Sequence, residues 1–201
     1  MKVTSIILAG GKNRRLGRNK ALETINGKSV IERVIERLAP LTAQLLIVTS
    51  PEQADILKVG KASILFDLYP GRGPLAGIYT GLLAAQSAQS IVVACDMPFL
   101  NTGLLSYMVE LSAGFDAVVP SLNEGMVEPL HAVYAKSCLD SIKERLEHNQ
   151  LGVNSFFDAV HVRYVERAEC ERLDPQLLSF FNINYPSDLE RAIALAEGGA
   201  A

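Results

Sequence analysis

The chain has 201 residues, of which 49% are apolar and 20% are charged, and its formal net charge is −3. This composition is typical of a globular protein with a substantial core, and the acidic balance argues against DNA or RNA as a partner. The three cysteines, Cys95, Cys138 and Cys170, have no C-x-x-C spacing that would suggest zinc. The sequence shows no secretory leader pattern and no apolar run of about 18 residues, so we expect a reduced, cytosolic protein without a membrane span.

The first predicted element is the apolar strand Val3–Leu8, which opens into a glycine-rich, cationic loop. Adjacent Gly10 and Gly11 let backbone N–H groups approach an anion, and the loop's cations can neutralise its charge: Arg14, Arg15, Arg18 and Lys20. The loop therefore predicts phosphate binding. It fits neither G-x-G-x-x-G nor the P-loop pattern, which disfavours a hydride-transfer enzyme and a P-loop ATPase. The alternative interpretation is a strand-to-helix turn with a solvated basic face.

Further along the chain, continuous apolar runs alternate with segments of helical spacing. The strand-like runs are Val3–Leu8, Gln44–Thr49, Ala62–Phe66, Ser90–Cys95, Ala117–Pro120 and Val160–Val165. The helix-like segments are Ser29–Leu38, Leu75–Gln86, Gly103–Leu111 and Lys136–Glu147. Continuous rather than alternating hydrophobicity indicates strands covered on both faces. We therefore predict a three-layer αβα sandwich with a mostly parallel, Rossmann-like sheet, and a single domain over residues 1–201, since no linker divides the chain.

Asp67 ends the third of these strands and begins a loop of three glycines and two prolines that runs to Gly77. Pro74 is expected in the first turn of the next helix, whose N-terminus would favour an anion. The alternative is a tight strand-to-helix connection that binds no ligand.

Asp96 follows the fourth strand and precedes Met97 and Pro98. Because Mg²⁺ takes one or two protein carboxylates together with substrate phosphate oxygens, a single aspartate at this edge is enough for a magnesium site. The alternative is that Asp96 caps the helix after Pro98. Ligands of such sheets bind beyond the carboxyl ends of the strands, so Gly10, Gly11, Asp67 and Asp96 are predicted to share one cleft.

The C-terminal half carries further polar residues in apolar surroundings. His131 lies between Leu130 and Ala132, and we favour a hydrogen-bonded structural role for it over substrate binding. Asn182 and Asn184 flank Ile183 and would share one face of an extended segment. Ser187 is expected to open the last helix as a capping residue, and Cys95 to be a small buried hydrophobe.

Together these motifs resemble the nucleotidyltransferases of the molybdenum cofactor pathway, and most closely the MobA-like guanylyltransferases. The segments that carry the resemblance are Leu8–Gly11 with Arg14–Leu22, Gly73–Gly77, Cys95–Pro98, Pro129–Tyr134 and Asn182–Pro186. The Leu8–Gly11 segment marks a broad superfamily that includes sugar-nucleotide synthetases. The segments Pro129–Tyr134 and Asn182–Pro186 narrow the resemblance to the guanylyltransferases.

The resemblance implies that an N-terminal half binds GTP and a C-terminal half binds the pterin. It places Leu8, Ala9, Gly10 and Gly11 around GTP, Arg15 and Lys20 on its phosphates, Asp67 on the nucleotide and Asp96 on magnesium. Arg15, Lys20 and Asp96 would be the catalytic residues, and Asn182 and Asn184 would lie on the pterin side. Asn19 and Tyr185 depart from the common pattern, where Asp and Thr are usual; the first could alter the loop's charge and the second the pterin pocket.

The reaction implied by the resemblance joins GMP from GTP to the terminal phosphate of molybdopterin, or of its molybdenum-loaded form, and releases pyrophosphate. Related alternatives use CTP or another phosphorylated acceptor. A nucleotide-binding regulator without turnover is a second class, disfavoured by the presence of both Lys20 and Asp96. A purely structural module is a third, disfavoured by the polar loops at the strand ends. Transient contact with upstream enzymes of the pathway is a further expectation from the resemblance.

Overall fold

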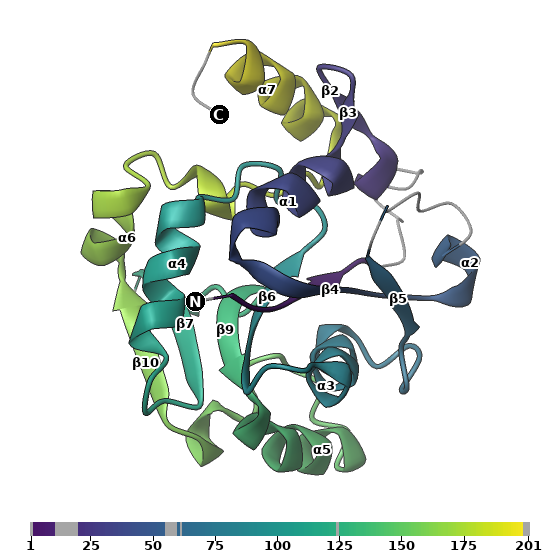
Figure 1. Cartoon of the computed structure of the whole chain (residues 1–201), viewed down its shortest axis with the longest axis vertical. Coiled ribbons are helices and arrows are strands. Elements are labelled where there is room, and N and C mark those ends of the chain that lie inside the picture. Colours follow the sequence, from purple (N-terminus) through teal and green to yellow (C-terminus); the bar gives the residue numbers. More distant parts are fainter. Residues whose placement is uncertain (1, 11–19, 55–59, 61, 124, 199–201) are drawn as a thin grey trace.

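The computed structural model describes residues 2–10, 20–54, 60, 62–123 and 125–198, with Lys20 described by its backbone only. A mixed sheet crosses the molecule in the strand order β10-β7-β9-β6-β1-β4-β5, with β8 paired to β7 (Figure 1). The strands are β1 (Val3–Leu8), β4 (Thr42–Thr49), β5 (Ser63–Phe66), β6 (Gln89–Ala94), β7 (Ala117–Asn123), β8 (Met126–Val127), β9 (His131–Ala135) and β10 (Val162–Glu166).

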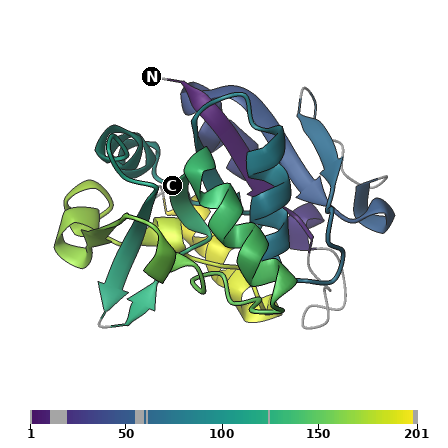
Figure 2. The same ribbon diagram turned by 90° about the horizontal axis from the view of Figure 1, so that it is seen from below.

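Helices cover both faces of this sheet. On one face, α1 (Val30–Leu38), α4 (Thr102–Leu111) and α6 (Arg167–Leu173) share one hydrophobic core with the strands. On the other, α3 (Pro74–Ala84) and α5 (Leu139–Glu147) share a second core, and both helices stand in front of the sheet when the molecule is seen from below (Figure 2). This arrangement confirms the predicted αβα sandwich.

The first strand shows why its residues form a fully covered strand. Ile7 packs into the core of α1 and α4, whereas Ile6 packs into the core of α3 and α5, and neither side chain is exposed. Apolar residues are therefore needed at successive positions. Helix α3 lies so close to β1 that a Cβ atom on Gly81 would stand 2.5 Å from Ile6 Cγ2.

A third, smaller core holds the C-terminal helix against the rest of the molecule. Helix α7 (Pro186–Glu197) packs against the short ribbon of β2 (Thr24–Ile25) and β3 (Lys28–Ser29). Ile25, Phe99 and Ile183 are buried at this junction. It brings the segment before α7 next to the loop that follows β6.

Most predicted strands and helices are confirmed within a few residues, but several features differ. The short elements β2, β3, β8 and α2 (Pro51–Ala54) were not predicted. Strand β9 was not predicted; it runs antiparallel between β6 and β7, while β1 pairs in parallel with β4 and β6. The last helix begins at Pro186 rather than after Ser187, because proline is suited to a first helical position and Asp188 accepts the N–H of Tyr185 at 2.8 Å. Helix α6 was also not predicted.

Within the described part of the chain, no helix is long and apolar enough to cross a membrane.

Candidate functional site

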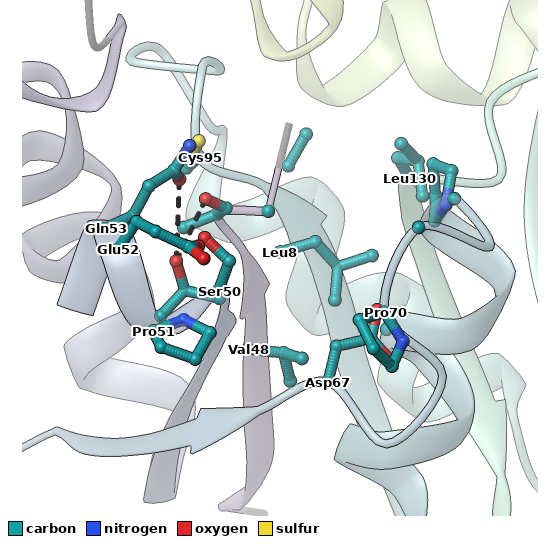
Figure 3. Close-up of a pocket in the computed structure, with 18 of the residues that line it drawn as sticks. Leu8, Val48, Ser50, Pro51, Glu52, Gln53, Asp67, Pro70, Cys95 and Leu130 are labelled. Atoms are coloured by element: carbon teal, nitrogen blue, oxygen red, sulfur yellow. Dashed lines mark hydrogen bonds between the residues drawn. The ribbon is translucent and has the colours of Figure 1, made fainter. Parts of the chain in front are cut away.

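The carboxyl ends of the parallel strands β1, β4, β5 and β6 meet at one edge of the sheet and enclose a cavity of about 560 Å³. Figure 3 shows Asp67 and Pro70 on one side of this cavity and Glu52 and Gln53 of α2 (Pro51–Ala54) on the other. Its lining includes the predicted residues Leu8, Ala9, Gly10, Asp67 and Asp96. The structure thus brings together the residues that the sequence placed at separate strand ends.

The end of β1 is held between its two neighbouring strands. The N–H of Ala9 donates to the carbonyl of Val48 at 2.8 Å, and the carbonyl of Leu8 accepts from the N–H of Cys95 at 3.1 Å. The hydroxyl of Thr49 donates to the carbonyl of Ala9 at 3.2 Å. These bonds fix the backbone that leads into the glycine-rich loop. Gly11, Arg15 and the side chain of Lys20 lie outside the described residues.

Asp67 is anchored on one of its two carboxylate oxygens. Oδ1 accepts the N–H of Tyr69 at 3.0 Å and lies 3.3 Å from the hydroxyl of Thr80 on α3. That hydroxyl also accepts the N–H of Leu68 at 3.1 Å. In the described part of the chain both of these contacts of the Asp67 carboxylate use Oδ1, so we expect Oδ2 to be the oxygen that meets a ligand in the cavity.

The loop after Asp67 approaches the cavity as the sequence predicts. Gly71 and Gly73 have φ angles of +82° and +74°, which residues with a side chain rarely adopt. Pro74 begins α3. Gly77 lies against β1, where a Cβ atom would stand 3.1 Å from Leu8 Cδ2. The positive end of the α3 dipole therefore lies at the cavity, where it favours an anion.

Asp96 lines the cavity and is half-buried. It does not cap the next helix, because α4 begins at Thr102 and Asn101 Oδ1 accepts the N–H of Leu104 at 3.0 Å. The alternative interpretation of Asp96 is therefore wrong. Its main-chain carbonyl accepts the N–H of Ile183 at 3.0 Å.

That last bond places Asn182 and Asn184 beside the cavity, although neither lines it. Ile183 is fully buried between them, and both asparagines are half-buried, as expected for an extended segment with one face covered. Asn182 Nδ2 donates to the carbonyl of Phe180 at 3.3 Å.

Burial changes the pKa of two titratable residues of the C-terminal half, the fully buried His131 and the half-buried Glu128. His131 is fully buried and packs against Phe180 with 4.7 Å between ring centroids and 52° between the ring planes, yet neither ring nitrogen has a hydrogen-bond partner among the described residues. The expected structural burial is confirmed, but the expected hydrogen bonding of the ring is not seen. Burial lowers the pKa of His131 to about 4, and burial raises the pKa of Glu128.

Sequence reasoning missed the side of the cavity formed by the end of β4. Thr49, Ser50, Glu52 and Gln53 line it, and the Ser50 hydroxyl holds the pKa of Glu52 below its ordinary value. The signal was available: β4 was predicted as a strand, and its carboxyl end lies at the same edge as those of β1 and β6. Cys95, expected in the core, is half-buried and also lines the cavity.

Comparison with known proteins agrees with this geometry. Residues 5–164 match the family model of the MobA-like NTP transferase domain. The chain is 39% identical to a probable molybdenum cofactor guanylyltransferase of Pelotomaculum thermopropionicum, over 98% of this chain and 95% of that one. It is 36% identical to a molybdenum cofactor guanylyltransferase of Desulfosudis oleivorans, over 98% and 97%.

Among solved structures, molybdopterin-guanine dinucleotide biosynthesis protein A from Archaeoglobus fulgidus superimposes with a TM-score of 0.85 at 31% identity, covering 97% of this chain and 99% of that one. The 2-C-methyl-D-erythritol 4-phosphate cytidylyltransferase of Thermus thermophilus superimposes with a TM-score of 0.72 at 22% identity, covering 98% and 100%, and shares the fold. The chain belongs to the MobA-like NTP transferase family and is a nucleotidyltransferase.

Proposed function

We propose that this enzyme transfers GMP from GTP to the terminal phosphate of molybdopterin, with or without bound molybdenum, and releases pyrophosphate. The observation that carries the proposal is full-length similarity to relatives named molybdenum cofactor guanylyltransferase, in a chain whose β1, β5 and β6 ends bring Gly10, Asp67 and Asp96 into one cavity. The reaction belongs to the cytoplasm, where GTP is available and thiols stay reduced.

The proposed division of labour follows the sheet. The N-terminal half of a single domain binds GTP between the ends of β1, β4 and β5, and the C-terminal half, with Asn182 and Asn184, binds the pterin. Leu8, Ala9, Gly10 and Gly11 contact the nucleotide, and Arg15 and Lys20 contact its phosphates. The enzyme also makes transient contact with the upstream enzymes that supply the pterin.

The carboxylates at the cavity fit a magnesium ion. Asp67 and Asp96, whose carboxylates carry hard oxygen atoms, both line the cavity. This donor set suits Mg²⁺, which keeps waters and phosphate oxygens beside one or two carboxylates. When bound, the ion supplies positive charge for the transferring phosphoryl group and the leaving pyrophosphate. Asp96 is the proposed ligand.

The chain's own task is alignment rather than proton transfer. The attacking acceptor phosphate is already an anion, so no general base is needed. The β1 end, the α3 N-terminus and the cationic side chains have to hold two mutually repelling phosphates in line and stabilise charge on the leaving group. The anchored carboxylate of Asp67 serves to fix the nucleotide.

The test is pyrophosphate release from GTP, with CTP and ATP as controls, in the presence and absence of molybdopterin and of Mg²⁺. We expect GTP-selective release that needs both molybdopterin and the cation. Asp96→Ala should lower kcat by about 100-fold or more, the scale seen when one charge-stabilising group is removed. The control is Asp140→Ala, an exposed aspartate of α5.

Three outcomes would contradict this proposal. Turnover of CTP in preference to GTP would overturn the choice of base. Binding of GTP without turnover would indicate a different acceptor or a regulator. Near-normal turnover by Asp96→Ala would remove Asp96 from the metal site.

A further inference from the structure

The segment between α6 and α7 is hydrogen-bonded to the loop that carries Asp96. The N–H of Ile183 donates to the Asp96 carbonyl at 3.0 Å. At the other end of the same loop, the N–H of Asn101 donates to Ser179 Oγ at 2.6 Å and Asn101 Nδ2 donates to the carbonyl of Leu173 at 2.8 Å. Residues 96–101 and 173–183, far apart in sequence, are thus joined at three points.

One aromatic contact joins the same two segments, and a second joins residues 173–183 to β9. Phe181 meets Phe99 of the Asp96 loop edge to face, with 5.7 Å between ring centroids. Phe180 packs against His131 of β9, which lies opposite Val93 of β6, three residues before Asp96. Residues 173–183 therefore contact Phe99, which follows Asp96 in the chain, and His131, whose partner Val93 precedes Asp96.

The segment is also fixed internally. Both carboxylate oxygens of buried Asp174 accept backbone N–H groups, from Leu178 at 3.2 Å and from Ser179 at 2.8 Å. At the other end, Asp188 Oδ2 accepts the N–H of Asn184 at 2.8 Å. Because both ends are held and Ile183 is buried, the backbone between the two asparagines is tied to the Asp96 peptide group through the Ile183 N–H.

We infer that Phe181 and Ile183 are positioning residues that couple occupancy of Asn182 and Asn184 by the acceptor to the placement of Asp96, so that acceptor and divalent cation bind cooperatively. This inference rests on the proposed function. A ligand that favours one position of the 180–184 segment favours the matching position of Asp96, and by reciprocity the cation increases affinity for the acceptor by the same factor.

A purely structural role for these contacts makes a different prediction. Phe99 and Ile183 belong to the core that holds α7 in place, so weakening this core would lower stability. It would leave the factor by which one ligand changes affinity for the other unchanged. The experiment must therefore measure the factor by which the acceptor changes the affinity for the cation.

The experiment measures Mn²⁺ affinity by electron paramagnetic resonance, with a non-hydrolysable GTP analogue present and with or without molybdopterin. In the wild type we expect molybdopterin to tighten Mn²⁺ binding by about 5-fold or more, the lower end of measured couplings. Phe181→Leu keeps an apolar side chain but removes the ring pair. It should reduce this factor below about 2-fold while Mn²⁺ still binds in the absence of acceptor.

The matched control is Phe157→Leu, the same change at another half-buried ring, which pairs with Phe156 at 5.0 Å in the core of α3 and α5. It should keep the wild-type factor. If Phe181→Leu fails to fold, Phe99→Leu removes the same ring pair from the other side.

The outcomes separate this inference from the function on which it rests. If GMP transfer is normal but Mn²⁺ affinity is insensitive to molybdopterin, or if Phe181→Leu retains the wild-type factor, the coupling is refuted and the function stands. If molybdopterin neither binds nor accepts GMP, the proposed function fails and the inference fails with it.

Discussion

The buried imidazole of His131 makes the stability of this protein depend on pH in a definite direction. Burial lowers its pKa from the ordinary 6.5 to about 4, while the nearby Asp174 carboxylate opposes that shift. Below about pH 6.5 the unfolded chain therefore binds a proton that the folded chain takes up only near pH 4. The stabilising contribution is complete above pH 6.5 and is lost as the pH falls toward 4.

The size of the effect follows from the two pKa values. Between pH 8 and pH 5 this one residue should remove about 2 kcal/mol from the free energy of unfolding. That is a large fraction of the stability of an ordinary domain. Carboxylates with lowered pKa, such as Glu169 and Asp116, titrate below their ordinary values of 4.5 and 3.8, so they contribute little in this window.

The assay is urea unfolding of the wild type and His131→Leu between pH 8 and pH 5. Leucine keeps an apolar group in the site and has no proton to bind, so the variant should lose about 2 kcal/mol less than the wild type over this range. His161→Gln, at an exposed position, is the control and should follow the wild type. Parallel loss of stability in wild type and His131→Leu would refute the reasoning.

Three further predictions concern the cavity and its supports. Burial raises the pKa of Glu128, so the folded chain holds the carboxyl proton of this residue more firmly than the unfolded chain, and stability falls as the pH rises and that proton is lost. Glu128→Gln should therefore be more stable than the wild type at pH 8. Urea unfolding that shows no gain in stability would contradict this prediction. Gly81→Ala should cost about 1 kcal/mol net, because overpacking against Ile6 outweighs the gain in helix propensity, and in thermal unfolding its combination with Ile6→Ala should cost less than the sum of the single changes. Thr80→Val removes the hydroxyl beside Asp67 Oδ1, so KM for GTP should rise severalfold while KM for the acceptor is unchanged; steady-state kinetics that show both rising together would contradict the anchoring role.

Much of the sheet was predictable because its strands are covered on both faces. Ile6 and Ile7 must both be apolar, and the same demand on the other parallel strands produces continuous runs that are visible without a structure. The place of Asp67 and Asp96 in the lining of the cavity was predictable because a polar side chain directly after such a run lies at the carboxyl edge of the sheet.

Strand β9 was not predictable by the same means. It begins at a histidine, which is usually read as a functional or surface residue, and it pairs antiparallel with strands that precede it in the chain. Its position depends on long-range packing, including the contact of the His131 ring with Phe180, that no local pattern encodes. The hydrogen bond between Ile183 and Asp96 could not be predicted from the sequence either, because it joins backbone groups of residues that are far apart in the chain.

The family model and the guanylyltransferase relatives match different lengths of this chain. The NTP transferase model ends at residue 164, so it contains the ends of β1, β4, β5 and β6 around the cavity but not the segment of Asn182 and Asn184. The guanylyltransferase relatives, in contrast, align over 98% of the chain and so include that segment. The cytidylyltransferase of Thermus thermophilus also superimposes over 98% of this chain, so the fold of the C-terminal segment is shared with an enzyme of another name. We therefore expect acceptor choice to lie in the side chains of that segment rather than in its fold. Since that segment is hydrogen-bonded to the main chain of Asp96, a change of acceptor during evolution has to be compatible with the position of this proposed metal ligand.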